Sequence, residues 1–347
     1  MTQNNDLRFG VIGAGRIGKI HAENLATRIP DVVVAAISDV NVKAAQELAT
    51  RLHVSAAEED YHALLSDSTI NAVAICSSTD THAKIIIEAA EAGKHIFCEK
   101  PIDLRLEKID AALDAVEKAG VKLQIGFNRR FDPNFRKVRT MVAEGKIGEL
   151  QILRITSRDP APPPLAYIKV SGGIFLDMTI HDFDMARYLS GSEVEEVYTA
   201  AGVMVDPAIG EAGDLDTSII TLRFANGAIG TIDNSRQAVY GYDQRVEVFG
   251  SNGMAQAHNN TPDNDVYFNA DGVHSAKPLY FFLERYTESF IAEMKEFVKS
   301  IRENTAPPVT GIDGRIPVVM GMAAKKSYLE HRPVRLDEIT TPVLQSD

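Results

Sequence analysis

Near its amino terminus the chain reads Leu7-Arg8-Phe9-Gly10-Val11-Ile12-Gly13-Ala14-Gly15-Arg16-Ile17-Gly18. The apolar run predicts a buried strand, and residues 19–28 beyond the glycines predict a helix. In a strand–turn–helix unit of this kind the first glycine permits a tight turn, the second lets the backbone approach a pyrophosphate, and the third lets helix and strand pack closely. The pattern therefore predicts a dinucleotide site made by Gly13, Gly15, Arg16, Ile17 and Gly18.

A carboxylate, Asp39, follows the next apolar run, residues 32–37, and stands 21 residues beyond Gly18. The ribose of a bound dinucleotide lies at this place, so Asp39 is expected to accept hydrogen bonds from both ribose hydroxyls. Val40-Asn41-Val42 offers no Arg or Lys to a 2′-phosphate, and the carboxylate repels one, so NAD is predicted over NADP. The alternative is that Asp39 caps a helix predicted over residues 41–52.

Further predicted strands over residues 72–76, 95–98 and 122–126 alternate with predicted helices. This alternation predicts an α/β fold, a doubly wound parallel sheet of the Rossmann type, over residues 1–126. Ligands bind such sheets at the carboxyl ends of the strands, which predicts that the rim of the cofactor site contains Ser77, Ser78, Thr79 and His82. For His82 a surface position at the start of a helix is an equal alternative.

Glu99-Lys100-Pro101 ends another predicted strand at the same edge of the sheet. An isolated lysine is most often a solvated charge. Beside a proline at a cofactor rim, however, a lysine can act on a reacting oxygen. Lys100 is therefore a candidate catalytic residue, and Glu99 is a candidate for the cofactor site.

The overall composition narrows the classes of partner. A chain of 347 residues exceeds the size of a single core, which predicts two domains. A net charge of -12 opposes binding to nucleic acid or to a membrane surface and favours a neutral small molecule. The polar start and the lack of a long apolar run predict a cytoplasmic protein. Cys76 and Cys98 lie in apolar runs and are expected to be buried thiols rather than a disulfide or a metal site.

After Gly148 the pattern changes to apolar strands separated by turn residues. Asn226-Gly227 is a strong hairpin signal between two of them. The predicted strands cover residues 150–155, 194–202, 217–224, 228–234 and 244–249. Because no repeated βαβ unit accompanies them, residues 127–347 are predicted to form an α+β substrate domain.

A polar stripe marks residues 172–189. Read as one helix, this segment places four polar side chains on one face, namely Asp177, His181, Asp184 and Tyr188. Acidic groups around one histidine orient the imidazole and suit it to proton abstraction, although such a stripe is more often the solvated side of a helix. Asp182 lies about 100° around the helix from His181, so its replacement is the internal control for a role of Asp177 on the stripe. A metal site is disfavoured, since no second histidine is near.

The glycine turn, Asp39 and Glu99-Lys100-Pro101 together resemble the glucose–fructose oxidoreductase / inositol dehydrogenase (Gfo/Idh/MocA) family over nearly the whole chain. The resemblance implies a second domain with a large, mostly antiparallel sheet whose open face often mediates dimers or tetramers, and it implies that Lys100 is catalytic. The Asp-x-x-x-His-x-x-Asp pattern of inositol dehydrogenases matches residues 177–184. That match implies His181 as the base, Asp177 orienting it and pairing with Lys100, and Asp184 binding substrate hydroxyls.

The same resemblance places Arg130 and Tyr240 in the substrate pocket. Better-known inositol dehydrogenases have a His-Arg-Asn-Pro segment where this chain has Ser157-Arg158-Asp159-Pro160, so Asp159 is the candidate substrate contact there and the exact polyol stays open. The implied reaction is NAD-dependent oxidation of myo-inositol or a related cyclitol, with hydride passing to the nicotinamide. An aldose dehydrogenase of the same family is the alternative. A non-catalytic NAD-binding regulator is opposed by the presence of the acid–base residues.

Overall fold

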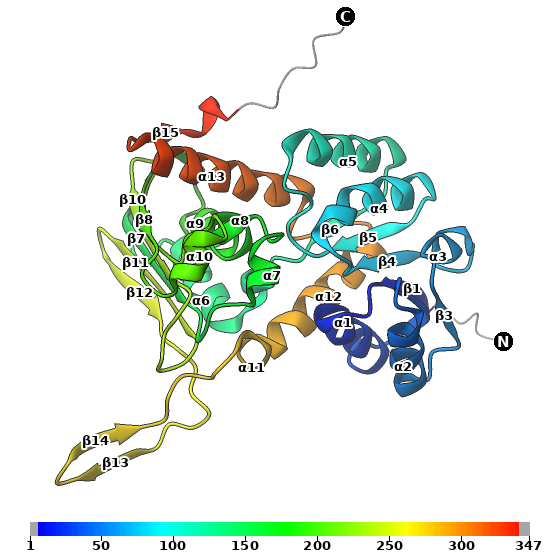
Figure 1. The fold of residues 1–347 in the computed structure, drawn as a ribbon, viewed down its shortest axis with the longest axis horizontal. Helices are drawn as coiled ribbons and strands as arrows, with labels where there is room; N and C mark the ends of the chain where they lie inside the picture. Colours follow the sequence, from blue (N-terminus) through cyan, green and yellow to red (C-terminus); the bar gives the residue numbers. More distant parts are fainter. Residues whose placement is uncertain (1–5, 340–347) are drawn as a thin grey trace, which may run out of the picture. The chain divides into compact units, whose positions relative to one another are not determined.

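The computed structural model describes residues 6–339, which form two compact units (Figure 1). The described part of the first unit comprises residues 6–128 and 288–316. The second comprises residues 129–287 and 317–339. The chain therefore leaves the first unit and returns to it, whereas the sequence assigned everything after residue 126 to one second domain.

The first unit is built on a six-stranded sheet in the order β3-β2-β1-β4-β5-β6, with every pair parallel. This confirms the predicted doubly wound sheet. Its strands are β1 (Leu7–Ile12), β2 (Val32–Ser38), β3 (Ala56–Glu58), β4 (Ala72–Ile75), β5 (His95–Cys98) and β6 (Leu123–Ile125). Its first helices are α1 (Arg16–Thr27), α2 (Val42–Leu52), α3 (His62–Ser66), α4 (Thr79–Glu91) and α5 (Leu106–Ala119).

Helix α12 (Thr287–Arg302) explains why the chain returns. Its buried residues Met294 and Phe297 belong to the same hydrophobic core as Phe9 of β1 and Leu25 of α1. The rings of Phe9 and Phe297 meet edge to face with centroids 6.1 Å apart. Burial of this apolar face places α12 with the first unit, a contact between distant segments that local sequence patterns do not reveal. Cys76 and Cys98 are free and buried, as expected.

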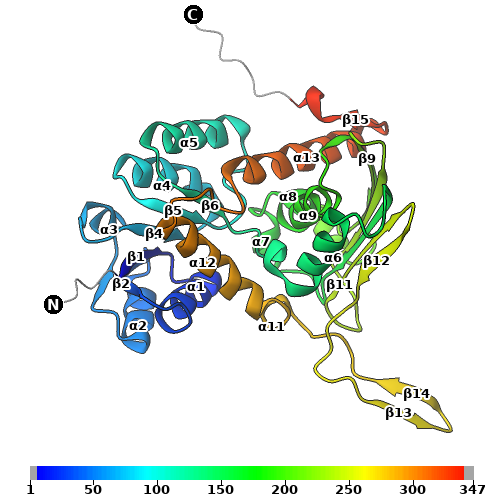
Figure 2. The ribbon, with the colours of Figure 1, turned by 180° about the vertical axis from the view of Figure 1, so that it is seen from behind.

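Figure 2 shows the sheet of the second unit from behind. It has seven strands in the order β12-β11-β7-β10-β9-β8-β15. All its pairs are antiparallel except β7 with β10. Its strands are β7 (Leu150–Arg158), β8 (Val194–Gly202), β9 (Thr217–Phe224), β10 (Ile229–Ser235), β11 (Asp243–Gly250), β12 (Gly253–Ala257) and β15 (Val334–Arg335). The mostly antiparallel sheet is confirmed, and Gly227 has φ of 86° in the predicted β9–β10 hairpin turn.

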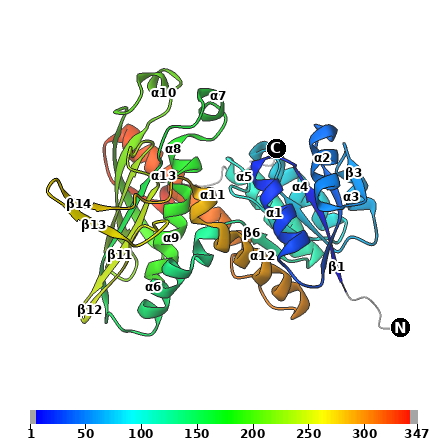
Figure 3. The same cartoon turned by 90° about the horizontal axis from the view of Figure 1, so that it is seen from below.

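Helices cover one face of this sheet, while the other face is open. Figure 3 shows α6 (Pro133–Ala143) and α9 (Ile180–Ser190) along the covered face. Four shorter helices are α7 (Leu165–Ile168), α8 (Gly173–Asp177), α10 (Pro207–Glu211) and α11 (Phe282–Arg285). Helix α13 (Gly311–Glu330) belongs to the second unit from Pro317 onward. Two 3-10 turns are η1 (Asn128–Phe131) and η2 (Leu336–Glu338). No helix within residues 6–339 is long and apolar enough to span a membrane.

A separate hairpin, β13 (Val266–Asn269) with β14 (Gly272–Ser275), extends from the second unit. Every residue of both strands is exposed. Figure 1 shows it projecting beyond the seven-stranded sheet. A two-stranded hairpin that buries none of its side chains is marginal on its own in water, so these strands lack the packing that stabilises the rest of the unit.

Candidate active site

The glycine turn joins β1 to α1 and has the three properties predicted for it. Gly13 has φ of 102°, and a Cβ there would lie 2.6 Å from the backbone of Cys76. A Cβ on Gly18 would lie 2.0 Å from the carbonyl oxygen of Gly13, so only glycine fits both places. Gly15, in contrast, is exposed and has open space around its missing Cβ. Gly15, Arg16 and Ile17 thus present the amino end of α1 for an anionic ligand to approach.

Asp39 reaches back to this turn from the end of β2. Its Oδ2 accepts the backbone N–H of Ala14 at 2.6 Å, and its Oδ1 accepts the N–H of Asn41 at 2.8 Å. Asn41 is itself the N-cap of α2 and makes no side-chain cap. Both readings of Asp39 therefore have support, since the carboxylate orders the start of α2 and also faces the glycine turn. Val40 beside it is 90% exposed and offers no cation.

The loop after β4 lies against the glycine turn at the point where the strand order reverses, which is the ligand-binding crevice of such sheets. Ser78 is the N-cap of α4, and Thr79 begins this helix. His82 is buried rather than at the surface. Its Nδ1 lies 2.8 Å from the carbonyl oxygen of Pro101 and its Nε2 lies 3.0 Å from that of Ser77. We therefore assign His82 to the scaffold that joins two rim segments.

The Glu99-Lys100-Pro101 segment follows β5 at the same edge. Glu99 is buried, and its Oε1 lies 2.6 Å from Nε2 of His21 on α1. Its backbone N–H donates to the carbonyl oxygen of Ile75, which ties the segment to β4. Lys100, the next residue, is partly exposed.

The polar stripe of the second unit is not one helix. Helix α8 ends at Asp177 and α9 begins at Ile180. At the break the N–H of Thr179 bonds to the carbonyl oxygen of Ile174, one residue further back than in an α-helix. The Thr179 side chain is fully buried and donates to Asn234 of β10 at 2.7 Å. The prediction of a continuous helix is wrong because this buried hydrogen bond fixes an interruption.

Asp177 ends α8 within a network of side chains that the sequence did not predict. Its Oδ1 accepts the hydroxyl of Tyr167 at 2.8 Å, and its Oδ2 lies 3.3 Å from a guanidinium nitrogen of Arg236. Arg236 is fully buried and also pairs with Asp214 at 3.2 Å. Asp214 in turn accepts the N–H of Ile174 at the start of α8. The network fixes Asp177 from both sides and links it to its own helix.

The Gly172-Gly173 pair serves this network. Gly172 and Gly173 have φ of 87° and 79°, and a Cβ on Gly173 would lie 2.7 Å from Oδ1 of Asp214. The close approach that the glycines permit is thus made by a carboxylate of the chain itself.

Asp182 cannot serve as the internal control for the stripe, because it is itself held in a buried ion pair. It is fully buried, its Oδ1 accepts a hydrogen bond from Arg129 at 2.6 Å, and its Oδ2 accepts one from Asn234 at 2.8 Å. Burial raises the pKa of this carboxyl group, and the Arg129 guanidinium opposes the shift. Most of α9 is buried, and of the stripe Asp184 is fully buried while His181 and Tyr188 are partly exposed, so the stripe is not a uniformly solvated face.

Arg130 and Asp184 bind each other. The guanidinium donates to both carboxylate oxygens at 2.6–3.0 Å, and the Asp184 side chain is fully buried. The Tyr188 ring lies 5.4 Å from the Arg130 guanidinium. Direct binding of substrate hydroxyls by Asp184 conflicts with this burial, because its oxygens already accept a bidentate pair. His181, in contrast, is partly exposed on the same helix.

Asp159, at the end of β7, lies in the electrostatic neighbourhood of Asp177. Burial and the negative charge of Asp177 raise the pKa of Asp159 to about 7, against the lowering effect of Arg236 and Arg129. Ser157, two residues before Asp159, also departs from the family pattern. It is fully buried and forms hydrogen bonds with Gln244 and Arg129. Of that segment, only Asp159 is thus placed to act beside Asp177.

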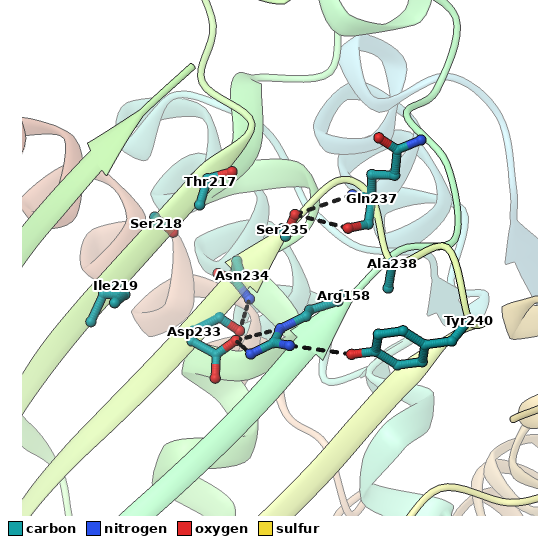
Figure 4. Close-up of a pocket in the computed structure, with 10 residues that line it drawn as sticks. All are labelled: Arg158, Thr217, Ser218, Ile219, Asp233, Asn234, Ser235, Gln237, Ala238 and Tyr240. Carbon is teal, nitrogen blue, oxygen red and sulfur yellow. Dashed lines mark hydrogen bonds and ion pairs between the residues drawn. The ribbon is translucent and has the colours of Figure 1, made fainter. Parts of the chain in front are cut away.

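Tyr240 lies elsewhere, in a pocket of about 360 Å³ (Figure 4). Its hydroxyl donates to Asp243 at 2.6 Å and accepts from Arg158, which pairs with Asp233 of β10. Side chains alternate along a strand, and the neighbouring Asn234 points toward α9. The pocket therefore lies over the open face of the sheet, away from Asp177, and the structure of this unit does not bring Tyr240 to the predicted substrate residues.

Both units of the chain match known oxidoreductase domains. Residues 7–127 match an oxidoreductase family with an NAD-binding Rossmann fold, and residues 135–256 match the GFO/IDH/MocA C-terminal domain. The chain is 53% identical to myo-inositol 2-dehydrogenase of Thermotoga maritima, covering 96% of this chain and 99% of that one. It is 45% identical to inositol 2-dehydrogenase of Rhizobium meliloti, covering 95% and 99%.

A solved structure agrees with these relatives. Scyllo-inositol dehydrogenase from Lactobacillus casei, with bound NAD(H) and scyllo-inositol, aligns at a TM-score of 0.90 and 31% identity, covering 96% of this chain and 99% of that one. Together with the open glycine turn of the first unit, the matches define an NAD-dependent oxidoreductase. The chain belongs to the GFO/IDH/MocA family.

Proposed function

We propose that this dehydrogenase oxidises one secondary hydroxyl of a cyclic polyol, and that its substrate is myo-inositol, which it converts to the 2-ketone. The names of the most similar relatives support the substrate class. The observation that carries the chemistry is the helix break. There Arg236 and Tyr167 hold Asp177 at the end of α8, and His181 follows on α9. Such an arrangement suits proton transfer from a neutral hydroxyl.

In the proposed reaction His181 accepts the hydroxyl proton and Lys100 stabilises the oxygen as negative charge develops on it. NAD, when bound, supplies the acceptor for the hydride that leaves the carbinol carbon. Arg236 pairs with Asp177 and holds that carboxylate at the helix break, where it is proposed to orient the His181 imidazole. The pairing of Asp177 with Lys100 stays a prediction.

The substrate-side residues divide into two roles. Asp159 is proposed to contact substrate hydroxyls, since its position beside Asp177 is the place where the chain departs from better-known inositol dehydrogenases. Arg130 and Asp184 are proposed to hold α9 in place. Tyr240 does not contribute from within the same chain in this proposal.

Replacing His181 by Ala or Lys100 by Met tests the assignment of catalytic residues. Each variant is expected to bind NADH normally and to lose about 10²–10⁴-fold in kcat, the usual worth of positioned acid–base groups. The control is Asp233→Asn, on the open face of the sheet, which should keep the wild-type kcat. A His181→Ala variant with near wild-type turnover at pH 7 to 9 would refute the role of the base.

The substrate and cofactor are tested together by a panel. We expect kcat/KM to be highest for myo-inositol or a close cyclitol with NAD, and much lower with NADP because Asp39 repels a 2′-phosphate. Higher kcat/KM for aldoses than for every cyclitol would establish the sugar dehydrogenase instead. Equal efficiencies with the two cofactors would contradict the role of Asp39.

We also propose that the chain forms a homodimer or homotetramer through the open face of the second unit. That face exposes large apolar side chains from five strands: Tyr198, Ile219, Ile229, Phe249 and Met254. An apolar surface of this kind favours contact with a second copy. Sedimentation should give an even multiple of the chain mass, and a monomer at micromolar concentration would refute the proposal. A place in polyol catabolism and a cytoplasmic location stay predictions.

A further inference from the structure

Behind Glu99 in the first unit lies a buried cluster of three titratable side chains. His21 comes from α1, Glu99 from the end of β5 and Glu293 from α12, and each residue is more than nine-tenths buried. Nε2 of His21 lies 2.6 Å from Oε1 of Glu99 and 3.9 Å from Oε1 of Glu293. Two carboxyl groups therefore face one imidazole nitrogen, which can donate only one hydrogen.

Glu293 has little to compensate a negative charge. Both of its carboxyl oxygens are buried without a hydrogen-bond partner among residues 6–339, and the nearby side chain of Gln124 donates to the backbone carbonyl of Glu293 instead. Besides His21 and Glu99, the thiol of Cys76 interacts electrostatically with Glu293. Burial raises the pKa of this thiol, so it remains uncharged.

An ionised carboxylate in such surroundings is costly, because it loses its hydration and gains no counter-charge. Burial, and the negative charge of Glu99, raise the pKa of Glu293 well above its ordinary value. The burial of both unpartnered oxygens and the raised pKa together favour the neutral acid over the ionised form. Glu99, by contrast, has a hydrogen-bond donor in His21.

A divalent cation is the other species that could neutralise two carboxylates beside a histidine. Zinc ligands stand about 2.0–2.1 Å from the metal, which in tetrahedral geometry separates them by about 3.3 Å. The 2.6 Å between His21 and Glu99 is shorter than this and is a hydrogen-bond distance. The geometry of the cluster thus favours a shared hydrogen over a metal ion.

We propose that Glu293 is a positioning residue, an uncharged carboxylic acid that leaves the His21–Glu99 hydrogen bond uncontested and thereby places Lys100. Glu99 precedes Lys100 directly in the chain, so loss of the His21–Glu99 hydrogen bond would remove an anchor from the segment that carries the ammonium group. Ionisation of Glu293 would bring a second anion to His21 and weaken the bond to Glu99. This inference rests on the proposed role of Lys100 in turnover.

Three variants of α12 test the proposal. Glu293→Gln keeps a neutral side chain of the same shape, Glu293→Ala removes it, and Glu288→Gln alters an exposed carboxylate on the same helix as the control. In NAD-linked turnover of the substrate that the panel identifies, Glu293→Gln should retain most of kcat and should hold it to higher pH than the wild-type enzyme. Glu293→Ala should lose about 10- to 100-fold in kcat, as misplacement of a catalytic group does.

A second measurement requires no substrate, so it is independent of the proposed function. A carboxyl group whose folded pKa is raised loses its stabilising contribution as pH rises from its unfolded pKa through its folded pKa. Because Gln cannot ionise, the Tm of Glu293→Gln should gain on that of the wild type between pH 5 and 9. The difference for Glu288→Gln should stay constant.

Two results would overturn the proposal. A Glu293→Gln variant as impaired as Glu293→Ala, or a Tm difference that does not change with pH, would mean that Glu293 is ionised in the folded protein. One equivalent of a divalent metal in the purified wild-type protein, absent from Glu293→Gln by elemental analysis, would identify a metal site instead.

Discussion

In the first unit the backbone mainly determines the shape of the glycine turn between β1 and α1. In the second unit, by contrast, buried ion pairs hold helix α9 in place. Around the glycine turn the decisive features are the missing side chains of Gly13 and Gly18 and the hydrogen bonds that Asp39 accepts from backbone N–H groups. Around α9 they are charges, chiefly Arg129 with Asp182 and Arg130 with Asp184. A site made of backbone is sensitive to added volume, while a site made of buried charges is sensitive to the removal of one partner.

The largest effect of this difference is expected on stability in the second unit. Asp182→Asn leaves the buried Arg129 without its counter-charge, which should cost about 3–5 kcal/mol and lower Tm by several degrees. The matched control is Asp233→Asn, which breaks the partly exposed pair with Arg158 and should cost about 0–1 kcal/mol. Similar losses in the two variants, measured by thermal unfolding, would contradict the account of buried charge.

Added volume should act on the cofactor turn in two distinguishable ways. Gly18→Ala places a methyl group against Gly13, so it should lower both Tm and the affinity for NADH. Gly15→Ala meets no neighbour, so Tm should stay near the wild-type value while NADH binding weakens where the pyrophosphate approaches. NADH fluorescence titration beside thermal unfolding measures both. Wild-type affinity in Gly15→Ala would show that the ligand approaches elsewhere.

The difference between a turn shaped by local backbone and a helix held by distant ion pairs also explains which features could be predicted from the sequence. Glycine spacing and a carboxylate at Asp39 are local constraints on one strand–turn–helix unit, so the turn was predicted residue by residue and its geometry is confirmed. The hairpin at Gly227 was predictable for the same reason. Residues 288–316 were misassigned because the packing of Phe297 on Phe9 joins segments far apart in the chain.

In the second unit the sequence identified polar residues without their partners. Periodicity of 3.6 residues grouped Asp177 with His181 but could not show the break that Thr179 makes by bonding to Asn234 on a strand. Arg236 and Asp214 were missed because they are separated from Asp177 by tens of residues and carry no motif. For Arg129 a signal was available, because it stands beside Arg130, which the family resemblance had placed in the substrate pocket.

A smaller effect is expected at Asp159, where burial and Asp177 raise the pKa to about 7. Since the pKa is raised in the folded state, this group contributes stability that is lost as pH rises from about 4 through about 7. Carbon-13 spectra of the aspartate carboxyls should show one resonance that titrates near pH 7 and is missing in Asp159→Asn. If every aspartate titrates below pH 5, the carboxyl group of Asp159 is better solvated than the structure indicates.

The most direct test of the proposed reaction follows the hydrogen that is transferred. Myo-inositol with deuterium at C2 should react more slowly than unlabelled myo-inositol under NAD saturation, and the NADH formed should carry one deuterium by mass spectrometry, since the hydride passes from the carbinol carbon to the nicotinamide. NADH without deuterium, or no turnover of myo-inositol by the NAD-saturated protein, would contradict oxidation at that carbon.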